Sequence, residues 1–250
     1  MARFIVWLIC CLTLMGAYGQ TRDTLYVDEG YVTLERTEFD NKLDSDLYYQ
    51  IIYDLDSVLL KKLFLNYYLG RLQPKKKSQL FGLLTQRNQM DTTQTMLIHY
   101  QDTLKRKEFY PKKSLIVYLE NGKHRHIPSY RAFLKGYRKC VKNYSKETGI
   151  QVYHYFHFNE GHPQEYKDIR WYADPLNVLR KMFYNKGDNT RDWRLFLFPN
   201  GDYMLLFGPM PREMYEDLKA HRNWDQHLQT FREQYQTVNP EIDLGASGGK

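Results

Sequence analysis

Cysteine is the first residue type to test for chemistry, because a pair of thiols can carry out redox reactions. The chain has three cysteines: Cys10 and Cys11 lie in an apolar stretch near its start, and Cys140 stands alone. Dithiol exchange needs one thiol activated at a helix N-terminus and a second that resolves the mixed disulfide. Cys140 falls instead on the apolar stripe of a predicted helix, where a small buried hydrophobic residue is the favoured interpretation. The sequence therefore argues against thiol–disulfide chemistry.

Histidines and acids form no recognisable catalytic or metal-binding motif. His124 and His126 would share one face of an extended segment, whereas His154 and His157 would point to opposite faces of a strand. The chain lacks an H-E-x-x-H helix, a G-x-S-x-G elbow and a Gly-rich phosphate loop. We therefore predict no catalytic residue, no cofactor and no metal. The alternative is an enzyme, either a degenerate redox protein or a hydrolase whose site these motifs miss.

Charge is the strongest remaining signal. Residues 61–149 hold twenty bases and five acids, whereas residues 21–60 hold three bases and ten acids. Such a basic stretch suits an anionic partner, unless the acidic segment docks onto it and leaves an ordinary charged surface. The candidate binding residues in predicted loops are Lys105, Arg106, Lys107, Lys112, Lys113, Lys123 and Arg125. A predicted helix adds Arg131, Lys135, Arg138, Lys139, Lys142 and Lys146.

The first residues predict export. Arg3 precedes a short apolar run, and Ala17-Tyr18-Gly19 has the small-x-small pattern of a cleavage site, so residues 1–19 are interpreted as a signal peptide. A membrane span needs about 20 apolar residues, more than this run offers, and no later stretch is long enough. We expect a periplasmic or extracellular protein without a transmembrane segment. Its expected partner is an anionic envelope component or an acidic protein rather than nucleic acid, and its oligomeric state stays open.

The segment over residues 20–90 is predicted to contain strands and helices. Thr24 to Val32 reads as a strand with a turn, and Ser78 could cap a short helix. A longer amphipathic helix is predicted from Asp46 to Gly70, because apolar residues recur four apart. These residues are Leu47, Ile51, Leu55, Leu59, Leu63 and Tyr67.

Residues 91–238 predict an α/β domain, followed by a flexible tail over residues 239–250. Three strands are expected, over Thr95–Tyr100, Ser114–Leu119 and Ile150–Phe158, with a lysine-rich loop between the first two. Helices are expected to begin at Ser129 and at Asp174-Pro175. A hairpin then turns at Pro199-Asn200-Gly201-Asp202, and a helix from Pro211 through Tyr235 ends the domain.

This order of elements resembles the thioredoxin fold, and LFLFPNGDYMLLFGPMPREMYEDL is the closest match, to that fold's hairpin and final helix. The stretch YVDEGYVTLERTEFDNKL looks like the opening of uncharacterised secreted proteins of Bacteroidetes-type bacteria that carry a thioredoxin-like C-terminal domain. The resemblance places the working loops at the C-terminal ends of strands, here the cationic loops 101–113 and 120–128.

The chain departs from the chemistry that this resemblance implies. Gln101-Asp102-Thr103-Leu104 and Asn121-Gly122-Lys123-His124 follow the first two strands without a cysteine. Thr190-Arg191-Asp192-Trp193 stands where the fold usually has a proline before the hairpin. We therefore predict a secreted, non-enzymatic thioredoxin-fold protein that binds in the cell envelope through a basic surface. A structural subunit whose basic face meets an acidic partner is a further alternative.

Overall fold

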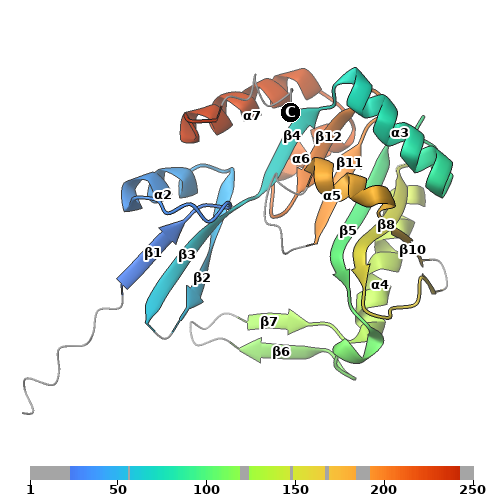
Figure 1. Cartoon of the computed structure of the whole chain (residues 1–250), viewed down its shortest axis with the longest axis horizontal. Coiled ribbons are helices and arrows are strands. Elements are labelled where there is room, and N and C mark those ends of the chain that lie inside the picture. Colours follow the sequence, from blue (N-terminus) through green and yellow to red (C-terminus); the bar gives the residue numbers. More distant parts are fainter. Residues whose placement is uncertain are drawn as a thin grey trace, which may run out of the picture.

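The computed structural model describes residues 23–55, 57–118, 124–146, 149–166, 169–183 and 192–242 (Figure 1). The predicted signal peptide lies outside these residues, as does most of the predicted tail. Within the described part, helices cover both faces of a mixed sheet and a smaller sheet stands to one side (Figure 1). The chain therefore has the predicted α/β class.

The main sheet has seven strands in the order β4-β12-β11-β5-β8-β10-β9. β5 pairs in parallel with β8, and β8 with β10, whereas the other neighbours are antiparallel. The strands are β4 (Tyr67–Arg71), β12 (Asp202–Leu206), β11 (Trp193–Leu197), β5 (Met96–Leu104), β8 (Gln151–Asn159), β10 (Ile169–Ala173) and β9 (Glu165–Tyr166). The predicted strands at β5 and β8 are confirmed. β5 runs on through Gln101–Leu104, where a loop was predicted.

The β11–β12 hairpin is confirmed where the sequence predicts it. Gly201 has a φ of +95°, a conformation that glycine adopts without steric cost. The Asn200 side chain accepts a hydrogen bond from the Asp202 backbone N–H at 3.0 Å, which closes the turn. Leu195 and Leu197 are fully buried, so this hairpin lies in the centre of the core.

Two helices cover each face of the main sheet. α4 (Tyr130–Val141), extended by η2 (Lys142–Lys146), and α6 (Arg212–Lys219) lie on one face. α3 (Pro74–Asn88) and α5 (Val178–Phe183), preceded by η3 (Pro175–Asn177), lie on the other. The predicted final helix is interrupted, because α6 ends before α7 (Trp224–Val238) begins, and α7 packs against edge strand β4.

The predicted helix starts have mixed outcomes. Ser129 is confirmed as the cap of α4, because its Oγ accepts a hydrogen bond from the Ala132 N–H at 3.3 Å. The helix predicted to begin at Asp174-Pro175 begins later, at Val178, after the short turn η3, and the Asp174 carboxylate accepts hydrogen bonds from the backbone N–H groups of Leu179 and Arg180. The start at Ser78 is wrong, because α3 already begins at Pro74, a residue favoured in the first turn.

The helix predicted from Asp46 to Gly70 is wrong, because this stretch forms strands. β1 (Asp23–Val27), β3 (Val58–Leu65) and β2 (Tyr48–Asp54) make a three-stranded sheet in the order β1-β3-β2, with α2 (Arg36–Leu43) beside it. Leu55 and Val58 exchange backbone hydrogen bonds, which closes the β2–β3 hairpin. Gly70 ends no helix and lies in β4, where an added Cβ would be 2.3 Å from the Tyr203 ring.

A long insertion separates β5 from α4. It contains η1 (Lys107–Phe109) and the separate hairpin of β6 (Leu115–Tyr118) and β7 (His124–Ile127) (Figure 1). The strand predicted over residues 114–119 is therefore present, but it does not join the main sheet. No helix in the described ranges is long and apolar enough to cross a membrane.

Candidate functional site

The basic loop predicted as a binding site lies against the start of α4. The Tyr110 ring contacts the rings of Tyr130 and Phe133, with centroids 5.6 and 4.7 Å apart. The Ser114 Oγ accepts a hydrogen bond from the backbone N–H of Ser129 at 3.0 Å. The exposed basic side chains on this segment are Arg106, Lys107, Lys112 and Lys113. The insertion and the helix thus form one continuous surface.

Three of the predicted binding residues are not part of this surface. Lys105 is paired with Glu160 at 2.7 Å, so its charge is largely compensated. Arg125 lies in β7 opposite Val117, but the structure does not describe its side chain. Lys123 lies outside the described residues. The structure therefore brings only part of the predicted set to the start of α4.

The helix itself supplies more positive charge. The segment from Tyr130 to Lys146 contains six bases and no acid. All six are exposed, and most are spaced along one side of the helix: Arg131, Lys135, Arg138, Lys139, Lys142 and Lys146. We call these six, together with Arg106, Lys107, Lys112 and Lys113, the basic face.

The acidic N-terminal segment does not cover the basic face. Figure 1 shows β1, β2 and β3 on the side of the molecule opposite α4. Two of its acids form ion pairs inside the segment, Asp40 with Arg36 and Glu38 with Lys42. The proposed neutralisation of the basic stretch by residues 21–60 therefore finds no support in the described part of the chain.

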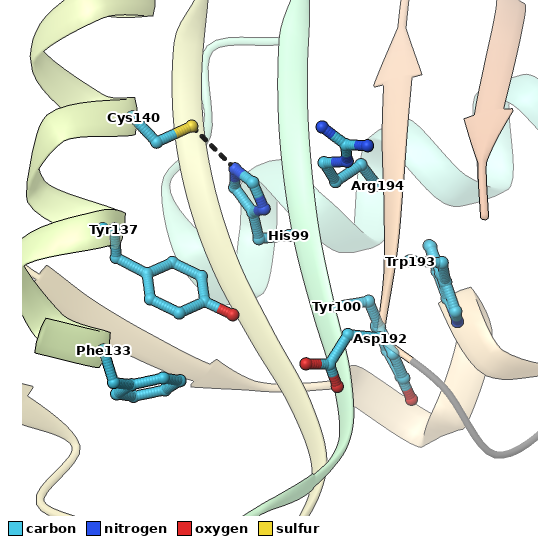
Figure 2. Close-up of a pocket in the computed structure, with 9 residues that line it drawn as sticks. His99, Tyr100, Phe133, Tyr137, Cys140, Asp192, Trp193 and Arg194 are labelled. Atoms are coloured by element: carbon cyan, nitrogen blue, oxygen red, sulfur yellow. Dashed lines mark hydrogen bonds between the residues drawn. The ribbon is translucent and has the colours of Figure 1, made fainter. Parts of the chain in front are cut away.

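A pocket of about 290 Å³ opens between α4 and β11, on the same helix that carries the basic face. Its wall includes the rings of His99, Phe133 and Tyr137, and Figure 2 shows these side chains with Cys140 and Arg194 between α4 and the sheet. The lining residues are His99, Tyr100, Phe133, Gly136, Tyr137, Cys140, Asp192, Trp193 and Arg194. Ligand sites of drug-like size span about 300–1,000 Å³, so this pocket suits a small molecule.

Cys140 and His99 meet in this pocket. The Cys140 Sγ lies 2.9 Å from the His99 Nε2 (Figure 2). Burial raises the pKa of Cys140 to about 11, against a smaller lowering by Arg194. Burial lowers the pKa of His99 to about 3, reinforced by His154 and Arg194. Both groups are therefore neutral at pH 7, and the pair is not an activated thiolate–imidazolium nucleophile. The thiol packs against the hydrophobic core as predicted, but it is only half-buried because it also lines the pocket.

Gln101 organises the polar end of the pocket. Its amide donates to the Tyr137 hydroxyl at 2.6 Å and to the Asp192 carboxylate at 3.2 Å. Asp192 is an exposed residue, yet its carboxyl points toward Tyr137 (Figure 2). Desolvation there raises the pKa of Asp192, although the bond from Gln101 works against this. Together, these groups offer hydrogen-bonding partners beside an aromatic wall.

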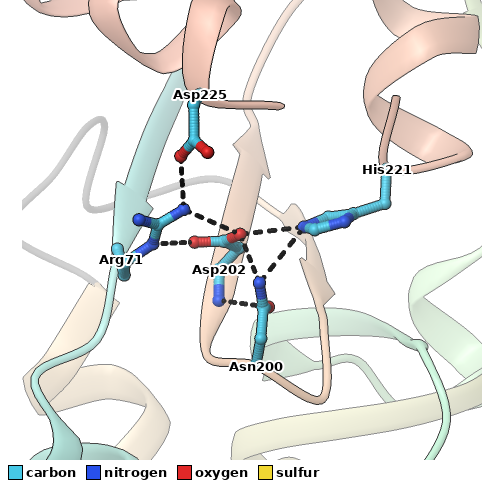
Figure 3. Close-up of polar contacts among 5 residues, drawn as sticks. All are labelled: Arg71, Asn200, Asp202, His221 and Asp225. Carbon is cyan, nitrogen blue, oxygen red and sulfur yellow. Dashed lines mark hydrogen bonds and ion pairs between the residues drawn. The ribbon is translucent and has the colours of Figure 1, made fainter. Parts of the chain in front are cut away.

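A second polar cluster surrounds Asp202 at the hairpin turn (Figure 3). The buried carboxylate accepts hydrogen bonds from Arg71 at 2.5 Å, Asn200 at 2.6 Å and His221 at 2.8 Å. Burial raises the pKa of Asp202, but these bonds together outweigh it and leave the pKa below its ordinary value. No hydroxyl or thiol is hydrogen-bonded to His221 within the described ranges, so this Asp–His pair lacks the nucleophile of a catalytic triad. Arg71 also binds Asp225, and the cluster joins the hairpin to β4 and α7.

The histidines lie as the sequence predicts for a strand. His154 stacks on His99 beneath α4, whereas His157 contacts Asn177 of η3 on the other face. Among the described residues, no group of three or more His, Cys, Asp or Glu side chains could hold a metal ion.

Comparisons with known proteins give no relative for this chain. It matches no protein-family model, and no curated protein or solved structure shows significant similarity to it. The function is therefore inferred from the basic face and the pocket between α4 and β11.

The sequence patterns did not predict the pocket between α4 and β11. His99 and Arg194 stand on strands that are far apart in the chain and pair in register only in the folded sheet. One signal was available: each is a polar residue inside an otherwise apolar strand, TMLIHY and WRLFLF. Such exceptions to a strand pattern are expected at functional positions.

Proposed function

We propose that this chain is a thioredoxin-like protein without dithiol chemistry, which binds a polyanionic component of the cell envelope through its basic face. The exposed, acid-free helix α4 joined to the basic insertion is the observation on which the proposal depends. The predicted export supplies the envelope location.

The strand order supports a thioredoxin-like core. Four neighbouring strands run in the order β12-β11-β5-β8, with β5 and β8 parallel and with β11 antiparallel to both β5 and β12. α4 connects the two parallel strands, and α5 connects the parallel half to the hairpin half. This is the arrangement of a crossover half and a hairpin half that the resemblance implies.

The start of α4 supports the loss of redox function. In a thioredoxin-like core, the reactive cysteines would stand at the N-terminus of this helix. Here Ser129, Tyr130, Arg131 and Ala132 occupy that position, and Cys140 lies near the other end of the helix. A thiol becomes reactive when its pKa is lowered, and desolvation raises the pKa of Cys140 despite the nearby Arg194, so Cys140 does not take over this role.

Electrostatics supports a polyanion as the partner. Arg131, Lys135, Lys139 and Lys142 are exposed and form no ion pair with a described carboxylate. Repeated cations on one surface attract a partner with repeated anions, and the attraction weakens with salt. A carbohydrate, lipid or protein polyanion would share this property.

The first test is a co-sedimentation experiment with purified cell envelopes over a salt series. We expect binding at low salt and release at high salt, because the Debye length falls from about 10 Å at 0.1 M to about 3 Å at 1 M. The variant Arg131→Gln/Lys135→Gln/Lys139→Gln/Lys142→Gln should lose the low-salt binding. A protein that stays in the supernatant at every salt concentration would contradict the proposal.

A matched control separates the basic face from net charge. Lys75, Lys181, Arg212 and Arg232 are exposed and lie outside the basic face. Replacing all four by Gln removes the same number of positive charges, but from other elements. This variant should therefore sediment with the envelopes like the wild type. Equal losses in both fourfold variants would show that only the net charge matters.

A further inference from the structure

Arg194 supplies an exposed cation beside the pocket. It lies on β11, an inner strand of the main sheet, between His99 of β5 and Leu206 of β12. Its neighbours on this helix-covered face include Leu97 and Phe196, both fully buried. No described carboxylate lies within ion-pair distance of its guanidinium. Its side chain is exposed, so the guanidinium is free to receive an anion at the pocket.

The space beside Arg194 is left open by a glycine. Gly136 of α4 lines the pocket, and a Cβ built at this position would meet no atom within 4 Å. Glycine inside a helix is less favourable than alanine. The sequence thus places a helical glycine and an arginine without a described carboxylate partner at the same pocket.

We propose that the pocket between α4 and β11 binds a small carboxylate with an apolar, preferably aromatic, body. The guanidinium of Arg194 would receive the carboxylate in a bidentate pair, a geometry that arginine favours. The rings of Phe133 and Tyr137 would contact the apolar body. This site is separate from the polyanion-binding role, because it needs one cation and a cavity rather than a charged surface.

The other polar groups restrict the orientation of the ligand. Asp192 stands two residues from Arg194, so an anion is favoured at the arginine end and disfavoured at the aspartate end. The Asp192 carboxylate and the Tyr137 hydroxyl would instead accept a hydrogen bond from a hydroxyl or ammonium group on the ligand. The volume of about 290 Å³ admits a single small molecule.

Isothermal titration calorimetry with 3-phenylpropionate and its neutral amide tests the proposal on the full chain. We expect the acid to bind at least about tenfold more tightly than the amide, because hydrogen bonds to a charged group contribute about 1.5–3 kcal/mol. Arg194→Gln should remove this preference and leave the amide affinity unchanged. Gly136→Leu should abolish binding of both compounds by filling the pocket.

Two matched controls keep the result interpretable. Gly82 lies in α3, and a Cβ there also meets no atom within 4 Å, so Gly82→Leu should bind both compounds like the wild type. Arg232→Gln removes an exposed arginine from α7 and should leave the preference for the acid intact. Equal binding of acid and amide, full binding by a folded Gly136→Leu, or no binding of 3-phenylpropionate by the wild type would overturn the proposal.

Discussion

At the residue scale, two stacked histidines lie on the face of the sheet beneath α4. His154 is 2% exposed and stacks on His99, with ring centroids 5.4 Å apart. It also contacts Tyr137 and Trp171, and its Nε2 has no hydrogen-bond partner in the described part of the protein. Burial lowers the pKa of His154 to about 4. A protonated imidazole would therefore be strongly disfavoured at this position.

This burial predicts a loss of stability in mild acid. A histidine in the unfolded chain has a pKa of about 6.5, so protons bind the unfolded state first as the pH falls toward the folded-state value. His154 should thus support full stability above about pH 6.5 and lose it progressively toward pH 4, by up to about 1.4 kcal/mol per pH unit. His154→Leu should reduce the slope of unfolding free energy against pH, measured by urea titration.

The core substitution Phe156→Leu, on the same strand and face as His154, provides the comparison for this experiment. It should lower stability equally at every pH, because it removes no titrating group. An unchanged pH slope in His154→Leu would show that His154 does not control the acid sensitivity.

Some residues of the candidate site could be predicted from the sequence and others could not. The absence of C-x-x-C could be read directly from the residues. The partners of Cys140 could not, because its contact with His99 joins positions 41 residues apart through packing of α4 on β5. Arg194 was equally hidden, since its isolation from carboxylates depends on which elements surround β11. The basic residues of the insertion were predictable as a group, but their continuity with α4 required the ring contacts of Tyr110.

At the element scale, the stretch from Leu47 to Tyr67 shows why a periodic pattern can mislead. A spacing of four residues fits one face of a helix and also one face of a strand, where every second residue shares a side. Tyr48, Tyr49, Ile51, Ile52 and Tyr53 favour a strand, and a turn follows them before Val58. Composition therefore outweighed the helical spacing. β10 was also missed, although Ile169 and Trp171 alternate with more exposed neighbours.

The β11–β12 hairpin, by contrast, was predictable because its turn residues and its apolar strands agree. Leu197 is fully buried at the end of β11, so Leu197→Ala should lower the free energy of unfolding by about 2–5 kcal/mol. Urea unfolding monitored by circular dichroism measures this change. Leu115→Ala, at a residue that is 48% exposed in β6, should cost no more than about 0.5 kcal/mol. Equal costs in the two variants would contradict the central position of the hairpin.

At the scale of the whole molecule, the small sheet and the main sheet share one hydrophobic core. Leu47, Leu63 and Leu65 of the N-terminal part belong to the same buried cluster as Leu195 and Phe231. β3 leads into β4 through Asn66, so a single stretch of chain contributes to both sheets. The Asn239 side chain donates to the Tyr48 hydroxyl at 3.0 Å and to the Tyr235 carbonyl at 2.9 Å, which ties β2 to the end of α7.

A shared core predicts that both sheets unfold in one cooperative transition. The slowest-exchanging backbone amides of β3 and of β5 should then show the same free energy of opening and the same dependence on urea, because both open only by global unfolding. Hydrogen exchange followed by mass spectrometry over a urea series measures both quantities in the same sample. Tyr48→Phe, which removes the hydroxyl that Asn239 binds, should lower the two values together. If β3 opened at a free energy several kcal/mol below that of β5, the small sheet would be a separate folding unit that only rests against the main sheet.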